Sequence, residues 1–374
     1  MVNGVKTVML MSNTSWSIIN FRASLIVALK QAGFRVLIAA PEDAYSSRIS
    51  ELGAEYIPLR MNNKGRNPFQ DVSLFVRVLG TLRRRRPDLL VSYTVKPNIY
   101  GSIAARLLGI PVVANIVGLG TVFSREGPLQ RLVSFMYRLA LGRCRYVFFH
   151  NADDHRFFTD RKIVRHESAR VVPGSGVDTA HFAPLPRMDG AARFTFLFLG
   201  RLLREKGVPE FVMAARQIRK ALPEVRFQVL GFAGVSNPSA ISAAEVKGWS
   251  EEGVVEYLGE ASDVRSFLAG ADCIVLPSYY REGVPRSLLE AASMGRPVIT
   301  TNVPGCRDAV IDRESGFLVE PRNVPDLIEK MTAMLKLSEK ARDRMGLRGR
   351  QHVQAKFDDS VVIGRYLGAI QGET

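Results

Sequence analysis

The segment DCIVLPSYYREGVPRSLLEAASMGRPVITT, residues 272–301, decides the fold because it contains a complete strand-helix-strand unit. The apolar run that begins at Cys273 predicts a buried strand, and Ser287–Met294 has the length and composition of a helix. Gly295 and then Pro297 end that helix, and a second apolar run follows directly. Because strands joined through a helix usually run parallel, the segment predicts a parallel sheet.

The same alternation of apolar runs and helix-length segments extends along most of the 374 residues. The expected strands are VKTVMLMS, FRVLIAAP, DLLVSY, PVVANIV, RYVFFH, FTFLFLG, RFQVLG, GVVEYLG, DCIVLPS, RPVITT and GFLVE, and the expected helices include 18–32, 69–85, 128–141, 208–222 and 287–294. Nearly continuous apolar runs fit strands that are covered on both faces. The fold class is therefore α/β, with doubly wound parallel sheets.

A chain of this length is too long for one ordinary α/β core and suits two. We expect one Rossmann-like domain at residues 1–175 and a second at 176–356. The stretch 171–186, rich in Gly, Pro and Ser, would join them. The helical segment 357–374 would pack back on the first domain. Ligands of such domains bind at the carboxyl ends of the strands, so a cleft between the two domains is the expected site.

Composition excludes several classes of protein. Hydrophobic residues make up 47% of the chain and charged residues 23%, which indicates a globular protein. No apolar run reaches the roughly 18 residues of a membrane span. The three cysteines show neither paired nor metal-ligand spacing, so we expect a reduced, cytoplasmic protein without structural disulfides or zinc.

The positive charge is concentrated in the first half of the chain. Residues 1–175 contain 25 Lys and Arg against 11 Asp and Glu, whereas residues 176–374 contain 26 against 25. Such asymmetry suggests that one domain faces nucleic acid, anionic lipid or a phosphate-bearing substrate. A solubilising surface is the alternative, although it would not need the asymmetry.

The first chemical motif is the pair Glu282 and Glu290. Glu282 lies in the loop before the predicted helix, and Glu290 lies two turns into it. The first N–H groups of that helix, near Gly283–Leu288, would face the cleft and could bind an anion or sugar hydroxyls. Ionised carboxylates accept hydrogen bonds from hydroxyl groups, so the pair could hold a sugar and a ribose. The alternative is a capping Glu282 and a surface Glu290.

The second motif is FLFLGRLLREKG, residues 196–207. Arg201 follows the strand at once, and Lys206 comes just before the next helix. Two cations on one loop suit a diphosphate and would stabilise negative charge that grows on a leaving diphosphate. An ordinary basic loop between a strand and a helix remains the alternative.

These motifs resemble the donor domain of the retaining glycosyltransferases of family 4, which have the GT-B fold. The resemblance rests on GRLLREKG, on Glu282 and Glu290, on EGVPRSLLEAASMGRPVITTNVPGCRDAV and on the linker VVPGSGVD. It implies a nucleotide-sugar donor, with uridine the favoured base, and no cofactor or required metal. It assigns Arg201, Lys206 and Glu282 to catalysis; the implied donor-binding residues are Gly231, Phe232, Leu258, Gly283, Val284, Pro285, Ser287, Leu288 and Glu290.

The first half resembles a narrower subgroup that builds bacterial surface polysaccharides or lipid-linked oligosaccharides. The implied reaction transfers a hexose or N-acetylhexosamine to a polyprenyl-diphosphate-linked saccharide. The candidate acceptor-binding residues are Ser15, Trp16, Asn20, Arg22, Lys96, Asn98, Gly118, Gly120 and Thr121. Many family members have a glycine-pair loop after the first strand and a cleft histidine. Here Ser12–Ser17 and Val117–Thr121 replace them, so no catalytic histidine is transferred. His150 ends the strand RYVFFH and could reach the cleft, but a structural role is favoured.

Two basic stretches bear on membrane association. Arg83–Arg86 exceed what helix capping needs, and PLQRLVSFMYRLALGRCRY places Leu129, Leu132, Val133, Met136, Leu139 and Ala140 on one helical stripe beside Arg131 and Arg138. This helix could lie on anionic lipid at the cytoplasmic face of the inner membrane, or it could be a core helix with a solvated edge.

Two other functions stay open, a nucleotide-sugar epimerase on the same scaffold and a basic nucleic-acid-binding protein. No recognition helix or aromatic stacking platform supports the nucleic-acid-binding alternative.

Overall fold

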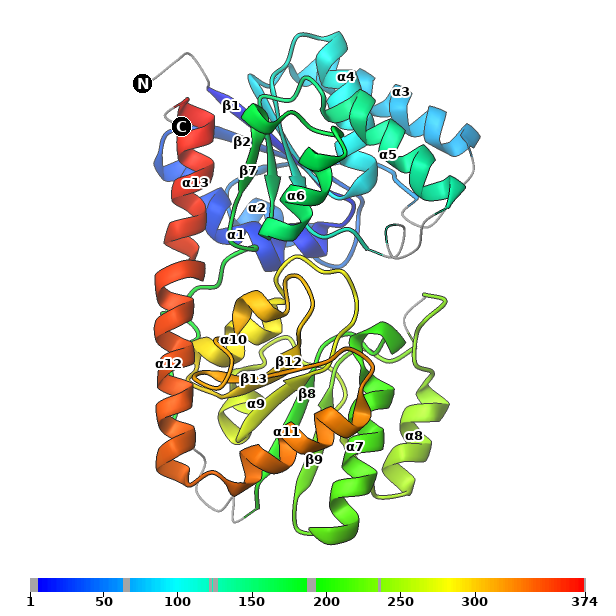
Figure 1. The fold of residues 1–374 in the computed structure, drawn as a ribbon. Helices are drawn as coiled ribbons and strands as arrows, with labels where there is room; N and C mark the ends of the chain where they lie inside the picture. The colour runs from blue at the N-terminus through cyan, green and yellow to red at the C-terminus, as the bar shows by residue number, and fades with distance from the viewer. Residues whose placement is uncertain are drawn as a thin grey trace. The chain divides into compact units, whose positions relative to one another are not determined.

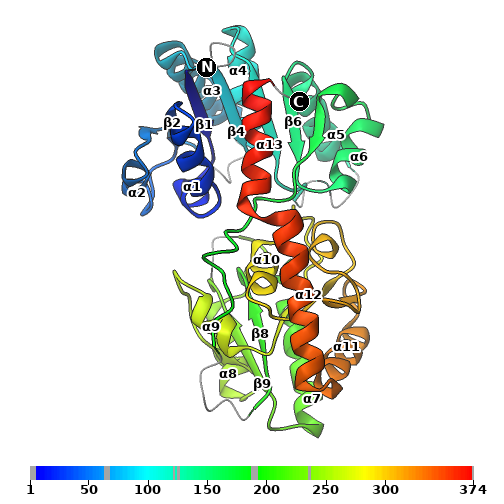
Figure 2. The same ribbon diagram turned by 90° about the vertical axis from the view of Figure 1, so that its left-hand side faces the viewer.

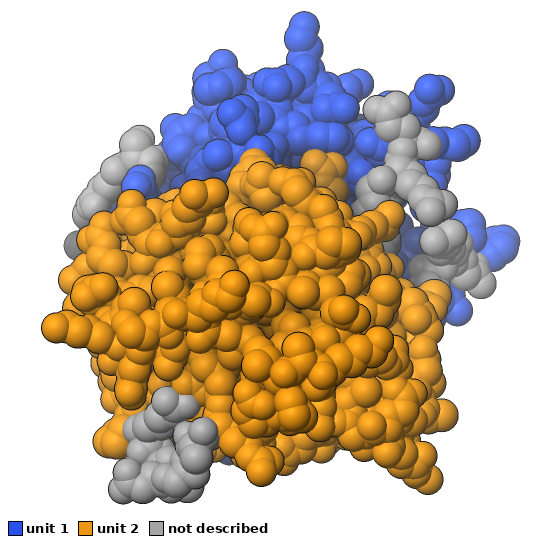
Figure 3. All heavy atoms as spheres, turned by 60° about the horizontal axis from the view of Figure 1, so that its bottom comes forward, with its two compact units in different colours: residues 1–176, 359–374 blue, residues 177–358 orange. Residues whose placement is uncertain are grey.

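The computed structural model describes residues 6–62, 68–120, 123, 127–186, 193–234 and 237–372. The chain divides into two compact units, which Figure 3 colours separately. Unit 1 contains residues 1–176 and 359–374, and unit 2 contains residues 177–358. Each unit has its own parallel sheet and its own hydrophobic core.

Unit 1 is built on a seven-stranded parallel sheet of order β3-β2-β1-β4-β5-β6-β7 (Figure 1). Its strands are β1 Thr7–Met11, β2 Arg35–Ala40, β3 Glu55–Pro58, β4 Leu89–Tyr93, β5 Val112–Ile116, β6 Tyr146–Phe149 and β7 Ala169–Val171. Its helices are α1 Ser15–Gln31, α2 Ser47–Glu51, α3 Pro68–Arg85, α4 Ser102–Leu107, α5 Pro128–Leu141, α6 Ala152–Asp160 and α13 Asp359–Gln371, with a π-helical turn η1 Pro97–Gly101 and a 3₁₀ turn η3 His166–Ser168.

Both faces of this sheet are buried, which explains its continuous apolar runs. Along β1, Val8 and Leu10 belong to the core on one face, and Met9 and Met11 to the core on the other. Alternate side chains of a strand point to opposite faces, so a strand covered on both sides is apolar at nearly every position. Helices α1 and α13 pack together over the face that carries Val8 and Leu10, as Figure 2 shows.

Unit 2 repeats the design with a six-stranded parallel sheet of order β10-β9-β8-β11-β12-β13. Its strands are β8 Thr195–Leu199, β9 Arg226–Leu230, β10 Glu256–Tyr257, β11 Cys273–Leu276, β12 Val298–Thr301 and β13 Gly316–Val319. Its helices are α7 Val208–Ala221, α8 Ala243–Glu251, α9 Arg265–Gly270, α10 Arg286–Ser293, α11 Val324–Lys336 and α12 Glu339–Phe357, with 3₁₀ turns η4 Arg204–Lys206 and η5 Arg307–Ala309.

The predicted fold class is confirmed, and each expected strand and helix is present. The short strands β3 and β7, which form the two edges of the first sheet, were not predicted. In both sheets the order reverses between neighbouring strands, at β1 and β4 in unit 1 and at β8 and β11 in unit 2. Open parallel sheets bind ligands at the carboxyl ends of strands beside such a reversal. The three cysteines are free and buried.

Candidate functional site

Two loops of unit 2 meet where its strand order reverses. One loop follows β8 and carries Arg201 and Lys206; the other follows the neighbouring strand β11 and leads to Glu282. The backbone N–H groups of Tyr279 and Tyr280 both donate to the carbonyl of Glu205, at 2.9 and 3.1 Å. The two loops are therefore joined by main-chain hydrogen bonds at the carboxyl edge of the sheet.

A nearly buried ion pair lies between these loops. The Nζ of Lys206 donates to Oε2 of Glu282 at 2.5 Å, and the two side chains are 9% and 14% exposed. The hydroxyl of Ser278, which is fully buried, donates to the other carboxylate oxygen of Glu282 at 3.0 Å. Glu282 is therefore held at both oxygens, and it fixes the Lys206 ammonium at the strand ends.

Glycine allows the two loops to approach so closely. Gly207 has a φ of +80°, in the left-handed region, and it links η4 to α7. A Cβ atom at this position would lie 2.2 Å from the carbonyl oxygen of Pro277 in the β11 loop. A side chain is excluded here both by the backbone conformation and by the space.

Arg201 presents a second cation at the same loop. Its side chain is exposed and forms no ion pair with any described residue. Its charge acts on Tyr280, where it opposes the rise that burial causes in the pKa of the phenol. Arg201 and Lys206 thus form one exposed and one nearly buried cation on a single loop, an arrangement that suits an incoming diphosphate.

Glu290 lies on helix α10, which follows the loop that carries Glu282. Pro285 precedes the helix, and within this described segment no side chain caps its first turn. Arg286 Nε donates to Glu290 Oε1 at 2.9 Å. Burial raises the pKa of Glu290, and the charge of Arg286 opposes that rise. The side chains of Val284 and Leu288 are buried in the core of unit 2, so only their backbone groups could contact a ligand.

The remaining donor candidates lie on neighbouring loops at this edge. Gly231 follows β9 and donates from its N–H to the carbonyl of Gly259 at 2.8 Å. Phe232 is 40% exposed, and its carbonyl accepts from the N–H of Leu202 in the β8 loop at 3.0 Å. Leu258, which is half-buried, comes directly after β10. These loops could receive a flat ligand such as a base.

The candidate acceptor residues of unit 1 fall into two groups. Some are occupied by structural contacts. Ser15 is fully buried and donates from Oγ to the carbonyl of Pro41 at 2.8 Å. Asn98 is fully buried, where it accepts from Ser92 Oγ and donates to the carbonyl of Asn115, both at 2.7 Å.

Arg22, on α1, is buried with its guanidinium carbon 4.4 Å from the ring centre of Tyr93. His150 is also buried, and its Nε2 has no hydrogen-bond partner among the described residues. Burial, together with the charge of Arg22, lowers the pKa of His150 well below its usual range. These surroundings therefore favour the neutral form of the imidazole.

The other acceptor candidates are partly accessible. Trp16 packs edge-on against Phe21, Asn20 donates to the carbonyl of Trp16 at 2.8 Å, and Lys96 pairs with Asp71 at 2.7 Å. Gly118 and Gly120 follow β5 with positive φ angles. Thr121 lies outside the described residues.

Sequence reasoning missed two members of the unit 2 cluster. Ser278 falls in a predicted loop, and no local sequence pattern shows that its hydroxyl reaches both Glu205 and Glu282. Arg286 had a visible signal, because it stands four residues before Glu290, and side chains at this spacing are neighbours on a helix. Among the described residues, no group of three or more His, Cys, Asp or Glu is arranged to hold a metal ion.

Two family models match the two halves of the chain. The model described as "Glycosyl transferases group 1" matches residues 193–337, and "Glycosyl transferase 4-like domain" matches residues 19–174. The chain belongs to glycosyltransferase family 4. The residues that these models match include all the catalytic candidates of unit 2.

Similar proteins support the same assignment along the whole chain. The glycosyltransferase is 27% identical over 373 residues to N,N'-diacetylbacillosaminyl-diphospho-undecaprenol alpha-1,3-N-acetylgalactosaminyltransferase of Campylobacter jejuni, with 96% of each chain covered. It is also 27% identical to UDP-Gal:alpha-D-GlcNAc-diphosphoundecaprenol alpha-1,3-galactosyltransferase of Escherichia coli, with 70% of each chain covered.

Solved structures share the GT-B fold. Anabaena HepE in complex with UDP has a TM-score of 0.79 at 17% identity, covering 98% of this glycosyltransferase and 100% of that chain. Sucrose-phosphate synthase from Thermosynechococcus elongatus has a TM-score of 0.80 at 19% identity, covering 99% of this glycosyltransferase and 100% of that chain.

Among the residues described for this glycosyltransferase, no helix has the length and hydrophobicity to cross a bilayer.

Proposed function

We propose that this glycosyltransferase moves a hexose or N-acetylhexosamine from a UDP-sugar to a saccharide linked to a polyprenyl diphosphate, with retention of anomeric configuration. The relatives whose names specify diphospho-undecaprenol acceptors support this substrate class. The assignment of the donor site rests on one observation: the Lys206–Glu282 ion pair joins the loop that carries Arg201 to the neighbouring loop, where the strand order of the second sheet reverses.

The two cations would act on the leaving diphosphate. As the bond between the anomeric carbon and the diphosphate oxygen breaks, negative charge grows on that oxygen. Arg201 can contact two oxygens through its guanidinium, whereas Lys206 supplies a compact charge already placed by Glu282. Because an ammonium has three N–H donors, Lys206 can keep Glu282 and still donate to a phosphate. Cations fixed in advance stabilise the transition state more than the ground state.

The neighbouring groups would bind the rest of the donor. Glu290 would accept hydrogen bonds from the ribose hydroxyls, and the loops at Gly231, Phe232 and Leu258 would hold the base. Glu282 would surround the sugar together with backbone groups of Gly283, Val284 and Pro285 before α10 and of Ser287 and Leu288 in its first turn. Proline has no N–H and would contribute only its carbonyl. These roles follow the family resemblance position by position.

Retention follows if the acceptor hydroxyl attacks from the face that the diphosphate leaves. In that step the anomeric carbon gains a bond to the acceptor oxygen and loses its bond to the diphosphate. A diphosphate oxygen takes the acceptor proton, so no side-chain nucleophile is required. The acceptor would bind to unit 1, where Arg22 and Lys96 are the proposed phosphate contacts beside Trp16, Asn20, Gly118 and Gly120.

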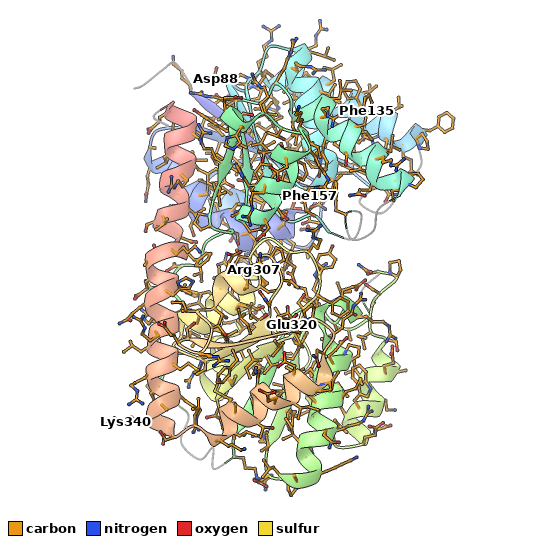
Figure 4. All side chains as sticks on the ribbon, viewed as in Figure 1. Asp88, Phe135, Phe157, Arg307, Glu320 and Lys340 are labelled. Atoms are coloured by element: carbon orange, nitrogen blue, oxygen red, sulfur yellow. The ribbon has the colours of Figure 1, made fainter. Side chains whose placement is uncertain are left out.

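We also propose that unit 1 rests on the anionic cytoplasmic face of the inner membrane. Apolar side chains more than 40% exposed lie on two helices that both pack against η1, namely Phe69, Val72 and Val76 of α3 and Leu129, Leu132, Phe135 and Leu139 of α5. We call this set the α3/α5 face; Figure 4 labels Phe135 on it.

The predicted single stripe of α5 is divided in the structure. Val133, Met136 and Ala140 pack toward the core, whereas Leu129, Leu132 and Leu139 are exposed. Exposed arginines lie on the same two helices: Arg131 on α5, and Arg83–Arg85 in the last turn of α3, with Arg86 directly after it. Exposed apolar side chains and arginines on the same helices match the chemistry of an anionic bilayer surface.

Donor turnover tests the proposed reaction. The full-length protein would be incubated with a panel of UDP- and GDP-sugars, with and without polyprenyl-diphosphate saccharides, while nucleoside diphosphate release is followed. We expect release from one UDP-sugar, stimulated by one lipid-linked acceptor, and an NMR spectrum of the product with the anomeric configuration of the donor. An inverted product would contradict retention. Epimerised donor without diphosphate release would favour the epimerase alternative.

A further inference from the structure

Helix α10 carries an ion pair that the proposed reaction does not explain by itself. Arg286 Nε donates to Glu290 Oε1 at 2.9 Å, and the two side chains are only 18% and 15% exposed. The residues are four apart, so they lie on the same face of the helix, one turn from each other. Both charges are withdrawn from water by their surroundings.

Helix stability does not account for Arg286. It is the first residue of α10, where the positive end of the helix dipole disfavours a cation. An Arg placed before a Glu at this spacing is also the less favourable of the two orders. The stability of the helix therefore does not explain why Arg286 pairs with Glu290.

The surroundings of Glu290 show what that contact does. Burial raises the pKa of Glu290, and the nearby carboxylate of Asp263 raises it further. Asp263 is itself engaged by Arg265, at 2.6 Å. The charge and hydrogen bond of Arg286 are what lower the pKa of Glu290 in opposition to both effects. Without Arg286, each remaining influence on Glu290 favours its protonated form.

An ionised carboxylate is a pure acceptor with two equivalent oxygens, which suits two adjacent hydroxyl donors, whereas the protonated group turns part of that acceptor capacity into an O–H donor. We infer that Arg286 is a positioning residue that keeps Glu290 ionised and oriented to receive the ribose diol of the donor nucleotide. This inference rests on the proposed assignment of Glu290 to the ribose. It adds Arg286 to the donor site as a group that acts through Glu290.

Nucleotide binding across pH tests this inference. The affinity for UDP would be measured by calorimetry from about pH 6 to about pH 8.5 in the wild type, Arg286→Met and Arg286→Lys. We expect Arg286→Met to weaken UDP binding about tenfold near pH 6, because a protonated Glu290 loses charge-assisted hydrogen bonds to the diol. The loss should shrink as pH rises, because Glu290 ionises again above its raised pKa. Arg286→Lys should keep most of the affinity.

Two controls separate the possible causes. Arg216 forms an exposed pair with Glu252 at 2.7 Å in the same unit, so Arg216→Met should bind UDP like the wild type. The 2′-deoxy analogue of UDP lacks one hydroxyl of the diol. If Arg286 acts through the diol contact, Arg286→Met should weaken binding of this analogue much less than it weakens binding of UDP.

The outcomes distinguish the inference from the proposed function. A loss in Arg286→Met that is the same at every pH and for both nucleotides would mean that Arg286 contacts the nucleotide directly, which overturns the inference. Unchanged affinity in Arg286→Met with weakened binding in Glu290→Gln would also overturn it and leave the ribose assignment intact. Unchanged affinity in Glu290→Gln would remove Glu290 from the ribose site and so overturn the assignment itself.

Discussion

At the scale of single residues, the two cations of the β8 loop carry the proposed chemistry. Arg201 is exposed, and Lys206 is nearly buried against Glu282. We predict that Arg201→Ala and Lys206→Ala each lower kcat by a factor of about 10² to 10³, as expected when a preorganised group that stabilises developing charge is removed. The measurement is nucleoside diphosphate release at saturating donor.

Arg204 provides the matched control for these substitutions. It lies on the same loop, is exposed, and pairs with Glu245 at 2.6 Å. Arg204→Ala should change kcat by less than about twofold, because surface ion pairs contribute little. Circular dichroism would verify that all three variants are folded. Near-normal turnover in both Arg201→Ala and Lys206→Ala would rule out the assignment of the diphosphate to this loop.

At the scale of elements, α13 is tied to the first sheet by a buried hydrogen bond. The Tyr366 hydroxyl donates to Oδ1 of Asn115 on β5 at 2.5 Å, and both residues are fully buried. Tyr366→Phe would leave that oxygen without its donor, at a cost of about 1–3 kcal/mol in the free energy of unfolding. Urea denaturation of unit 1, followed through the fluorescence of Trp16 in a Trp249→Phe background, would measure the loss.

The second unit supplies the comparison for this prediction. The Tyr257 hydroxyl donates to the carbonyl of Gly231 at 3.0 Å, entirely within unit 2. Tyr257→Phe should leave the Trp16 transition in place. An unchanged Trp16 transition in Tyr366→Phe would show that the hydrogen bond adds nothing to the attachment of α13.

At the scale of the whole molecule, charge and exposed apolar surface coincide in one half of the chain. Nearly all of the net charge of +15 belongs to the first 175 residues, which also contain the α3/α5 face. We predict binding to vesicles with about one-third anionic lipid and little binding to neutral vesicles. Binding should weaken as salt rises, since surface charges separated by more than about 8–10 Å are screened at physiological ionic strength.

Vesicle cosedimentation of matched variants checks which surface binds. The double variant Leu132→Ser and Phe135→Ser should sediment less than the wild type at every salt concentration. Leu347→Ser, at a leucine of α12 that is 54% exposed, should sediment like the wild type. Equal sedimentation of all three proteins with anionic vesicles would exclude the α3/α5 face as the contact surface.

The fold could be predicted from the sequence because buried strands appear in it as runs of apolar residues. Central strands covered on both faces are apolar at nearly every position, and the regular spacing of such runs predicted each central strand of both sheets. The edge strands β3 and β7 show no such run. Their burial patterns are mixed and they are only four and three residues long, so they form because a neighbouring strand offers them hydrogen bonds.

Some residues of the candidate site could likewise be predicted from the sequence, and others could not. Arg201, Lys206 and Glu282 could be picked from the sequence because they lie in the loops that follow predicted strands, where parallel sheets bind ligands. The roles of Ser278 and Asn98 could not, because the sequence around a polar residue just after a strand is the same whether its side chain faces a ligand or a distant carbonyl. By itself, the sequence determined the strand and helix pattern, the charge asymmetry and the residues at the strand ends. Only the tertiary structure decided which polar groups are partners, because hydrogen bonds such as that between Tyr366 and Asn115 join residues 251 positions apart.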